Sequence, residues 1–242
     1  MLLNQYKEIL GAWMQAAGNI ISAIASTPTD RLSDSAQANL NTVGLALQAV
    51  GGGLETEGQG TPFSLEYIGN ALATIGVLED LTAAVIEFPD ETDTTLNIQG
   101  NLLQALGSAI AAVDETQDST TVGQLEGFIG NVIQTIGSVI QVIGIKVQSA
   151  GSQQDQDDNE QTNEDDNQDQ ADGQNSQQNQ VGSYMKWNQQ NGSNDQNQND
   201  QSQKEGQNLI AVGSWIQAIG AVIAAIGQQK EEMHELQLGI DE

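Results

Sequence analysis

The chain of 242 residues lacks cysteine and has one histidine, three prolines and six basic residues against 33 acidic ones. Without cysteine it has no disulfide framework, thiol nucleophile or cysteine-ligated metal, and its redox compartment is left open. The formal net charge of -27 repels nucleic acid at long range, so DNA and RNA are excluded as partners. A chain of this length still has enough residues for one or two domains, each with a core that folds without disulfide bonds or metal ions.

Residues suited to catalysis or to holding a cofactor are equally scarce. The single histidine, His234, lies in a charged stretch near the end of the chain, which favours a solvated helix end over a general base. No nucleophile elbow, phosphate-binding loop or metal-binding helix motif is present. The run from Asp155 begins like a calcium loop, but Glu160 replaces its glycine and Asp166 its final glutamate. The sequence therefore predicts no enzyme activity, no cofactor, no metal site and no small-molecule substrate.

What the chain does contain is an internal repeat of the form Gly-x-x-apolar-Gln-x-apolar-Gly, found in six copies and usually with the central glutamine. In the fifth copy, apolar residues such as Ile133 and Ile136 recur at helical spacing, which excludes strand alternation. Asn131 and Gln134 occupy the opposite face, and the glycines follow the border between the faces. Each copy is therefore predicted to be an amphipathic helix. The repeat glycines are Gly11, Gly18, Gly44, Gly51, Gly69, Gly76, Gly100, Gly107, Gly130, Gly137, Gly144, Gly213, Gly220 and Gly227.

The arrangement of these helices follows from the segments between them. Acidic, threonine-rich connectors are short enough to make consecutive helices antiparallel neighbours. We therefore predict an all-α fold, an up-and-down array or bundle of six helices. The expected helices cover roughly residues 4–26, 34–55, 64–88, 95–114, 123–149 and 207–237.

One long stretch has a different composition, rich in Gln, Asn, Asp, Gly and Ser and almost without aliphatic residues. Such a stretch cannot build a core and is predicted to be a disordered linker. The last repeat copies the fifth so closely that we expect its helix to dock back onto the others. The predicted regions are a five-helix repeat region at 1–148, the linker at 149–206 and the sixth helix at 207–242.

Glycines inside helices require an explanation, because each costs about 0.5–1 kcal/mol relative to alanine. Their fixed spacing indicates close helix packing, in which neighbouring backbones approach without intervening side chains. The alternative is that glycines end helices, above all at Gly51 to Gly53. Trp13 and Trp215 occupy equivalent positions in the first and last repeats. We interpret them as large core residues, with anchors for a partner as the alternative.

Each predicted helix has a central charge-free body, whereas carboxylates crowd the connectors, the linker and the C-terminal end. The charge-free bodies are residues 9–29, 35–54, 67–78, 94–113, 127–145 and 206–229. We interpret these carboxylates as solvating groups without a chemical role. Where an ordinary surface helix carries ions, these helices present Asn, Gln, Ser and Thr. Such neutral faces either pack against another copy through side-chain hydrogen bonds or face water.

Two functional hypotheses follow. The first is a non-enzymatic structural or protein-interaction protein that associates with itself or with another helical protein. The second is a membrane-associated protein, because residues 209–227 and 128–147 approach the length of a spanning helix and have small-residue borders. Against it, these segments contain Asn or Gln and few basic anchors flank them.

The location is expected to be cytoplasmic by default, with the membrane as the alternative. The apolar run from Ile9 to Ile24 ends in small residues like a signal peptide. Lys7 and Glu8 do not form a basic leading cluster, however, and the same motif recurs inside the chain. We therefore interpret this segment as the first repeat.

The repeated units resemble those of a family of uncharacterised repetitive helical proteins from spore-forming Gram-positive bacteria. The clearest units are GNVIQTIGSVIQVIG, residues 130–144, and VGSWIQAIGAVIAAIG, residues 212–227. The resemblance covers all six repeats and does not extend to the linker. It implies repetition and helicity, and it provides no catalytic residues to transfer.

Overall fold

The computed structural model describes residues 2–60, 63–117, 122–168 and 181–238, with side chains described for all of these except 151–198. These residues form six α-helices and no strand, which confirms the predicted all-α fold. The helices are α1 Leu2–Ser26, α2 Asp34–Gly58, α3 Leu65–Val85, α4 Asp90–Glu115, α5 Gln124–Gln168 and α6 Val181–Leu238.

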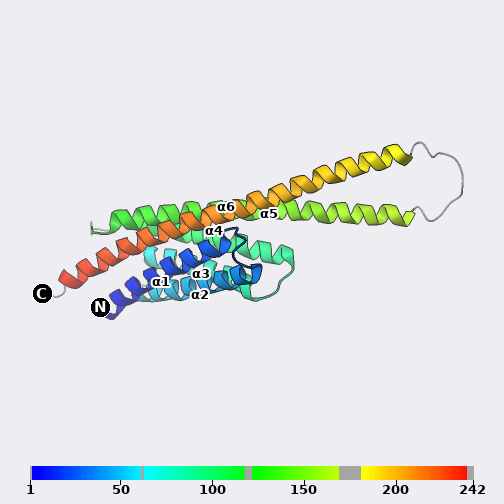
Figure 1. The fold of residues 1–242 in the computed structure, drawn as a ribbon. Helices are drawn as coiled ribbons and strands as arrows, with labels where there is room; N and C mark the ends of the chain where they lie inside the picture. The colour runs from blue at the N-terminus through cyan, green and yellow to red at the C-terminus, as the bar shows by residue number, and fades with distance from the viewer. Residues whose placement is uncertain (1, 61–62, 118–121, 169–180, 239–242) are drawn as a thin grey trace.

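The six helices form a closed ring. Each helix packs against the next along the chain, and α6 packs against α1 as well. Among the described residues no helix backbone packs directly against another across the ring. The helices run up and down, and both chain ends lie at the same end of the bundle, which we call the termini end (Figure 1). The opposite end, called the far end, carries the connectors from α1 to α2 and from α3 to α4.

Local signals set the helix boundaries. Ser33 and Ser64 cap the starts of α2 and α3 by accepting hydrogen bonds from backbone N–H groups of the first turn. Pro89 precedes α4, whose first turn is rich in acidic residues that favour the positive end of the helix dipole. The alternative that Gly51 to Gly53 end a helix is wrong, because α2 continues to Gly58. The reason is packing, because Gly51 lies so close to α1 that the contact leaves no room for a side chain.

The distribution of apolar side chains is inverted relative to a soluble bundle. Apart from Leu45, Val77 and Val142, every buried hydrophobic residue of the described chain is an alanine. The large hydrophobic side chains instead point outward from all six helices. Those exposed include Leu10, Trp13, Ile20 and Ile24 on α1, Val43 and Val50 on α2, Ile75 and Leu78 on α3, Leu102, Leu106 and Val113 on α4, Ile129, Ile136, Val139 and Ile143 on α5, and Val212, Trp215, Ile219 and Ile226 on α6.

The last helix packs against α5 and α1. From Asn199 onward its side chains are described, and Gly206 lies against Gly144 of α5. The packed part of α6 therefore begins before residue 207, the predicted start. Most of the predicted linker, residues 149–206, falls outside the residues whose side chains are described.

Candidate functional site: the polar interior of the bundle

The glycines of the repeat face one another across three antiparallel hairpins, α1/α2, α3/α4 and α5/α6. A methyl group placed on Gly11 would lie 2.5 Å from the carbonyl oxygen of Gly51, and one on Gly18 would lie 2.5 Å from that of Gly44. Real Cβ atoms are not found so close to other heavy atoms, so these positions accept only glycine. The other facing pairs are Gly69 with Gly107, Gly76 with Gly100, Gly130 with Gly220, Gly137 with Gly213, Gly144 with Gly206 and Gly227 with Gly123.

The residue four positions after each glycine packs over a glycine of the partner helix. The side chain of Gln48 lies against Gly18, and that of Gln141 lies against Gly213. This position is the central glutamine of the repeat motif, so close helix packing turns the glutamines toward the inside of the hairpins. The polar faces of the helices meet in the interior of the ring, and the apolar faces are left outside.

A chain of hydrogen bonds crosses the interior and joins four helices. It starts at Asp80 of α3, whose Oδ2 accepts a hydrogen bond of 2.6 Å from Gln104 Nε2 of α4. Gln104 Oε1 accepts one of 2.7 Å from Gln217 of α6, whose own Oε1 accepts one of 2.7 Å from Gln141 of α5. Ser214 closes the chain by donating to Gln141 Oε1 at 3.2 Å. Buried amides that bond one another in this way tie the helices together without ions.

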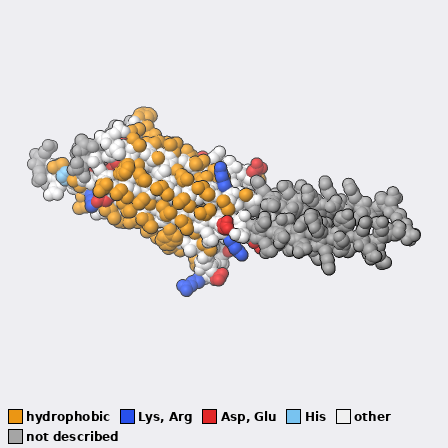
Figure 2. Space-filling view, turned by 90° about the horizontal axis from the view of Figure 1, so that it is seen from above, with side chains coloured by type: hydrophobic (Ala, Val, Ile, Leu, Met, Phe, Trp, Pro, Cys, Tyr) orange, Lys and Arg blue, Asp and Glu red, His pale blue; other side chains and the backbone are white. Residues whose placement is uncertain are grey.

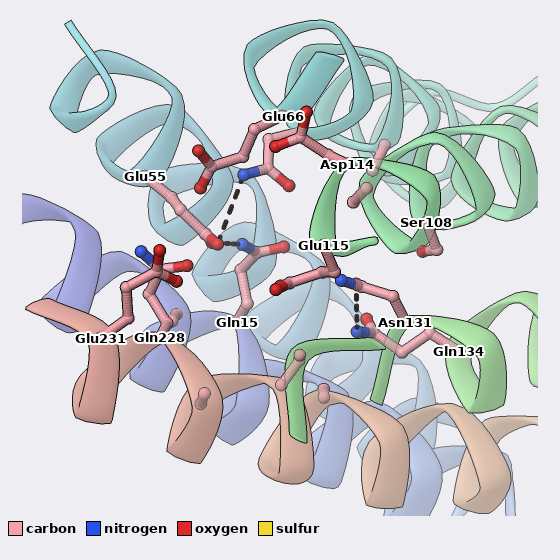
Figure 3. Close-up of a pocket in the computed structure, with 18 residues that line it drawn as sticks. Gln15, Glu55, Glu66, Ser108, Asp114, Glu115, Asn131, Gln134, Gln228 and Glu231 are labelled. Atoms are coloured by element: carbon pink, nitrogen blue, oxygen red, sulfur yellow. Dashed lines mark hydrogen bonds between the residues drawn. The ribbon is translucent and has the colours of Figure 1, made fainter. Parts of the chain in front are cut away.

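Toward the termini end, carboxylate and amide side chains converge on a cavity of about 60 Å³, the termini-end cavity (Figure 3). Glu55 accepts hydrogen bonds from Gln15 and Asn70, and Gln134 donates to Asn131 beside it. A polar cavity of this size has room for a few water molecules. The arrangement can therefore hold water inside the bundle.

At the far end a wider cavity of about 680 Å³, the far-end cavity, leads into the ring. Asp90, Glu91 and Asp93 of α4 contribute carboxylates to it, and Asp80 lines it deeper inside. Burial, with the charge of Asp90 adding to it, raises the pKa of Asp93 above its ordinary value. The cavity is thus lined by groups that attract positive charge.

The contact between α1 and α6 closes the ring and is also acidic. Gln228 donates to both Glu8 and Glu232, at 3.1 and 2.9 Å, and Gln5 donates to Glu235 at 3.2 Å. Both Glu8 and Glu232 are buried. The interpretation of all carboxylates as solvating groups is therefore wrong for these two residues, and also for Glu55 and Asp80, which lie inside the bundle as well.

The two tryptophans lie on the outer surface, so the core interpretation is wrong. Trp13 and Trp215 are 39% and 41% exposed. The indole N–H of Trp13 donates to Gln229 Oε1 at 2.9 Å, and that of Trp215 donates to Thr27 Oγ1 at 3.0 Å. Their role as partner anchors stays a prediction.

Of the other predicted features, His234 lies near the termini end of α6, and the calcium-like run from Asp155 falls outside the residues whose side chains are described. Among the described residues, no group of three or more His, Cys, Asp or Glu side chains is placed to hold a metal ion.

Sequence reasoning missed the buried acids, although the repeat itself carries the signal. Asp80 stands four residues after Gly76, and Glu55 four residues after Gly51. Both therefore occupy the position of the repeat glutamine, which the packing turns inward. An acid at that position predicts a carboxylate in the interior.

These observations define a closed six-helix bundle with a polar interior and an apolar outer surface. The chain belongs to a family of unknown function, DUF6944, whose family model matches residues 6–194. This agrees with the expected membership of an uncharacterised family. No curated protein and no solved structure matches the chain in these comparisons.

Proposed function

We propose that this protein is a non-enzymatic integral membrane protein, in which six helices cross the bilayer and enclose a polar chamber for a solute. The observation that carries the proposal is the ring of large apolar side chains around all six helices. Figure 2 shows one side of this belt as a broad hydrophobic field with charged side chains only at its margins. A soluble monomer rarely exposes more than a few hundred Å² of contiguous apolar surface.

The lengths of the helices support crossing. Five of the six charge-free bodies, such as Thr94 to Val113, extend for about 20 residues, which rise about 30 Å and match the hydrocarbon core of a bilayer. The body in α3, residues 67–78, is shorter and ends before Glu79 and Asp80. By length and composition, α1, α3, α5 and α6 each contain a segment able to span a membrane. Because α2 and α4 stand between these helices in a closed ring, they lie at the same depth.

The interior satisfies the second requirement of a membrane protein. Polar side chains in lipid need partners within the protein, and here they turn inward and bond one another. Ionisable residues of spanning helices characteristically face the bundle interior or a water-filled cavity, as Asp80 does. Small residues at the helix contacts are equally typical of helices packed in lipid.

Membrane fractionation of the full chain tests the proposal. We expect the protein to stay with the membranes after high-salt and alkaline washes and to dissolve only in detergent. The variant Ile136→Lys places a charge in the middle of the outer face of α5. It should make the free energy of membrane insertion less favourable by about 2.5–3.5 kcal/mol. Leu125→Lys is the matched control, because Leu125 is also exposed but lies outside the charge-free body. Equal insertion of both variants would contradict the proposal.

Topology gives a second test. Six crossings place both chain ends on one side of the membrane and residue Asp34, in the first far-end connector region, on the other. The chain has no cysteine, so single cysteines at Leu3, Asp34 and Leu238 can be labelled with an impermeant maleimide in sealed vesicles. We expect Leu3→Cys and Leu238→Cys to react together, and Asp34→Cys to react only from the opposite side. Labelling of all three from one side would count against spanning.

The hypothesis of a soluble, self-associating structural protein stays a prediction. Its expected contact surface was the neutral Asn and Gln face of each helix, and in the bundle those faces meet within one chain. Recovery without detergent as a homogeneous assembly, with its mass determined by light scattering, is the result that would favour this hypothesis.

A further inference from the structure

We propose that the far-end cavity binds cations and that Asp80, deep inside it, is the group that holds one small monovalent cation. The inference rests on the proposed function, since it assigns a solute to the polar chamber. The cavity measures about 680 Å³, which accommodates a cation with several of its waters. No Lys, Arg or His is among the described residues that line it.

The mouth of the cavity attracts positive charge. Asp90, Glu91 and Asp93 all line it from the first turn of α4. A cleft lined by charges of one sign raises the local concentration of counter-ions. These carboxylates draw cations in from the far end.

Asp80 provides the observation that points to a ligand independently of this acidic mouth. Its side chain is buried, with 6% of its surface exposed, and it lines the cavity. Oδ2 accepts hydrogen bonds from Gln104 and Asn101, at 2.6 and 3.5 Å. Oδ1, by contrast, has no hydrogen-bond partner among the described residues. A buried carboxylate with an unpaired oxygen is costly, and a bound cation offsets that cost.

The donor set selects the class of cation. Carboxylate, amide and hydroxyl oxygens suit hard cations and do not suit soft transition metals. Calcium takes six to eight oxygen ligands, and magnesium takes a near-ideal octahedron of waters, one or two carboxylates and substrate phosphates. The described residues hold no cluster of three acidic or histidine ligands, so a partly hydrated monovalent ion fits this single carboxylate best.

The interior beyond Asp80 limits how far the ion travels. Gln104 and Gln217 are not part of the cavity lining and are hydrogen-bonded to each other, and Gln217 also accepts a hydrogen bond from Gln141, which lines the cavity. An ion would have to break these bonds to continue toward the termini end. The geometry therefore describes a binding site reached from one face, and in this conformation these hydrogen-bonded amides close it on the other side.

Sodium binding to the purified full chain in detergent tests the inference. Equilibrium dialysis with radioactive sodium should show one saturable site, and Asp80→Asn should weaken it by about tenfold or more. Glu87→Gln is the matched control, because Glu87 is an exposed acid at the same end that does not line the cavity; its affinity should stay within about twofold. No saturable binding by the wild type, or equal binding by Asp80→Asn, would overturn the proposal.

A second measurement does not depend on the folding of the Asp80 variant. Ser149 lines the cavity, whereas its neighbour Ala150 is exposed outside it. In single-cysteine variants, the ratio of reaction rates with cationic and anionic methanethiosulfonates should be about tenfold higher for Ser149→Cys than for Ala150→Cys. Equal ratios would refute an acidic, cation-attracting cavity. Both assays run in detergent solution, so their failure is distinguishable from a failure of membrane fractionation.

Discussion

The contacts within the three hairpins differ in kind from the contacts between them. Within α1/α2, α3/α4 and α5/α6, glycines face glycines and the backbones touch, a contact we call a glycine seam. Between hairpins, side chains fill the space. Gly52 of α2 faces the hydroxyl of Thr74, Thr135 donates to the carbonyl of Ala105 at 3.4 Å, and small residues join α1 to α6.

This difference indicates that the hairpin is the repeated unit of the fold. In a glycine seam the helices match by backbone shape, and Gly11 and Gly18 meet Gly51 and Gly44 in antiparallel order seven residues apart. That spacing fixes the register wherever the motif recurs. Contacts between hairpins have no such spacing and depend on side chains, so they tolerate variation more readily.

The largest effect is expected from placing a methyl group in a glycine seam. In Gly137→Ala the new Cβ would lie 2.6 Å from the backbone nitrogen of Gln217 and 2.7 Å from the carbonyl oxygen of Gly213. Neither backbone group can move without shifting the helix, so we expect the free energy of unfolding to fall by about 2–3 kcal/mol. Denaturant titration in detergent, followed by circular dichroism, measures it.

The control for this variant is Gly53→Ala. Gly53 lies inside α2 but has no heavy atom within 4 Å of a new Cβ. The same substitution should therefore stabilise the protein by about 0.5–1 kcal/mol through helix propensity alone. Destabilisation of both variants by similar amounts would show that the glycine seams are not the basis of the fold.

A smaller effect is expected from the interior chain of hydrogen bonds, in which Gln217 joins the α5/α6 hairpin to the α3/α4 hairpin through Gln104. Gln217→Leu removes the bonds from α6 to Gln104 and Ser138 and leaves Gln141 without its acceptor. We expect a loss of about 1–2 kcal/mol, because polar groups in the interior stay unpaired. Gln207→Leu, an exposed position on the same helix, should change stability by less than about 0.5 kcal/mol. Thermal melts of the two variants provide the measurement. Equal melting temperatures would contradict a stabilising role of the interior chain of hydrogen bonds.

The sequence was sufficient to predict the helices but not the direction in which they face. Periodicity placed Ile136 and Gln134 on opposite faces of α5, and the structure agrees. Which face turns inward depends on what surrounds the bundle, since the usual assignment assumes water outside. Here Ile136 is 48% exposed, and Gln134 lines the interior. Periodicity alone is the same for both arrangements, so it could not decide between them.

The interior site was predictable in part. The sequence indicates the neutral polar faces, and hydrogen bonding of these faces to one another is one of the two arrangements that it allows. The partners were not predictable, because Gln104 and Gln217 are far apart in the sequence and meet only when the ring closes. Closure of the ring also brings Glu8 of the first helix next to Gln228 of the last helix. No local sequence pattern indicates this contact.

The smallest effect is expected from the ion pairs at the termini end, although both join helices that share a glycine seam. Lys7 Nζ lies 2.6 Å from Glu57 Oε1, and Lys230 Nζ lies 2.5 Å from Glu126 Oε1. The side chains of Glu57 and Lys230 are well exposed. Water and salt screen such pairs, so Lys7→Ala should cost about 0.5 kcal/mol or less, Lys230→Ala should shift the denaturant midpoint only slightly, and both effects should shrink at high salt. Denaturant midpoints at low and high salt provide the measurement. A loss as large as that of Gly137→Ala would mean that charge, and not backbone shape, sets the register of the hairpins.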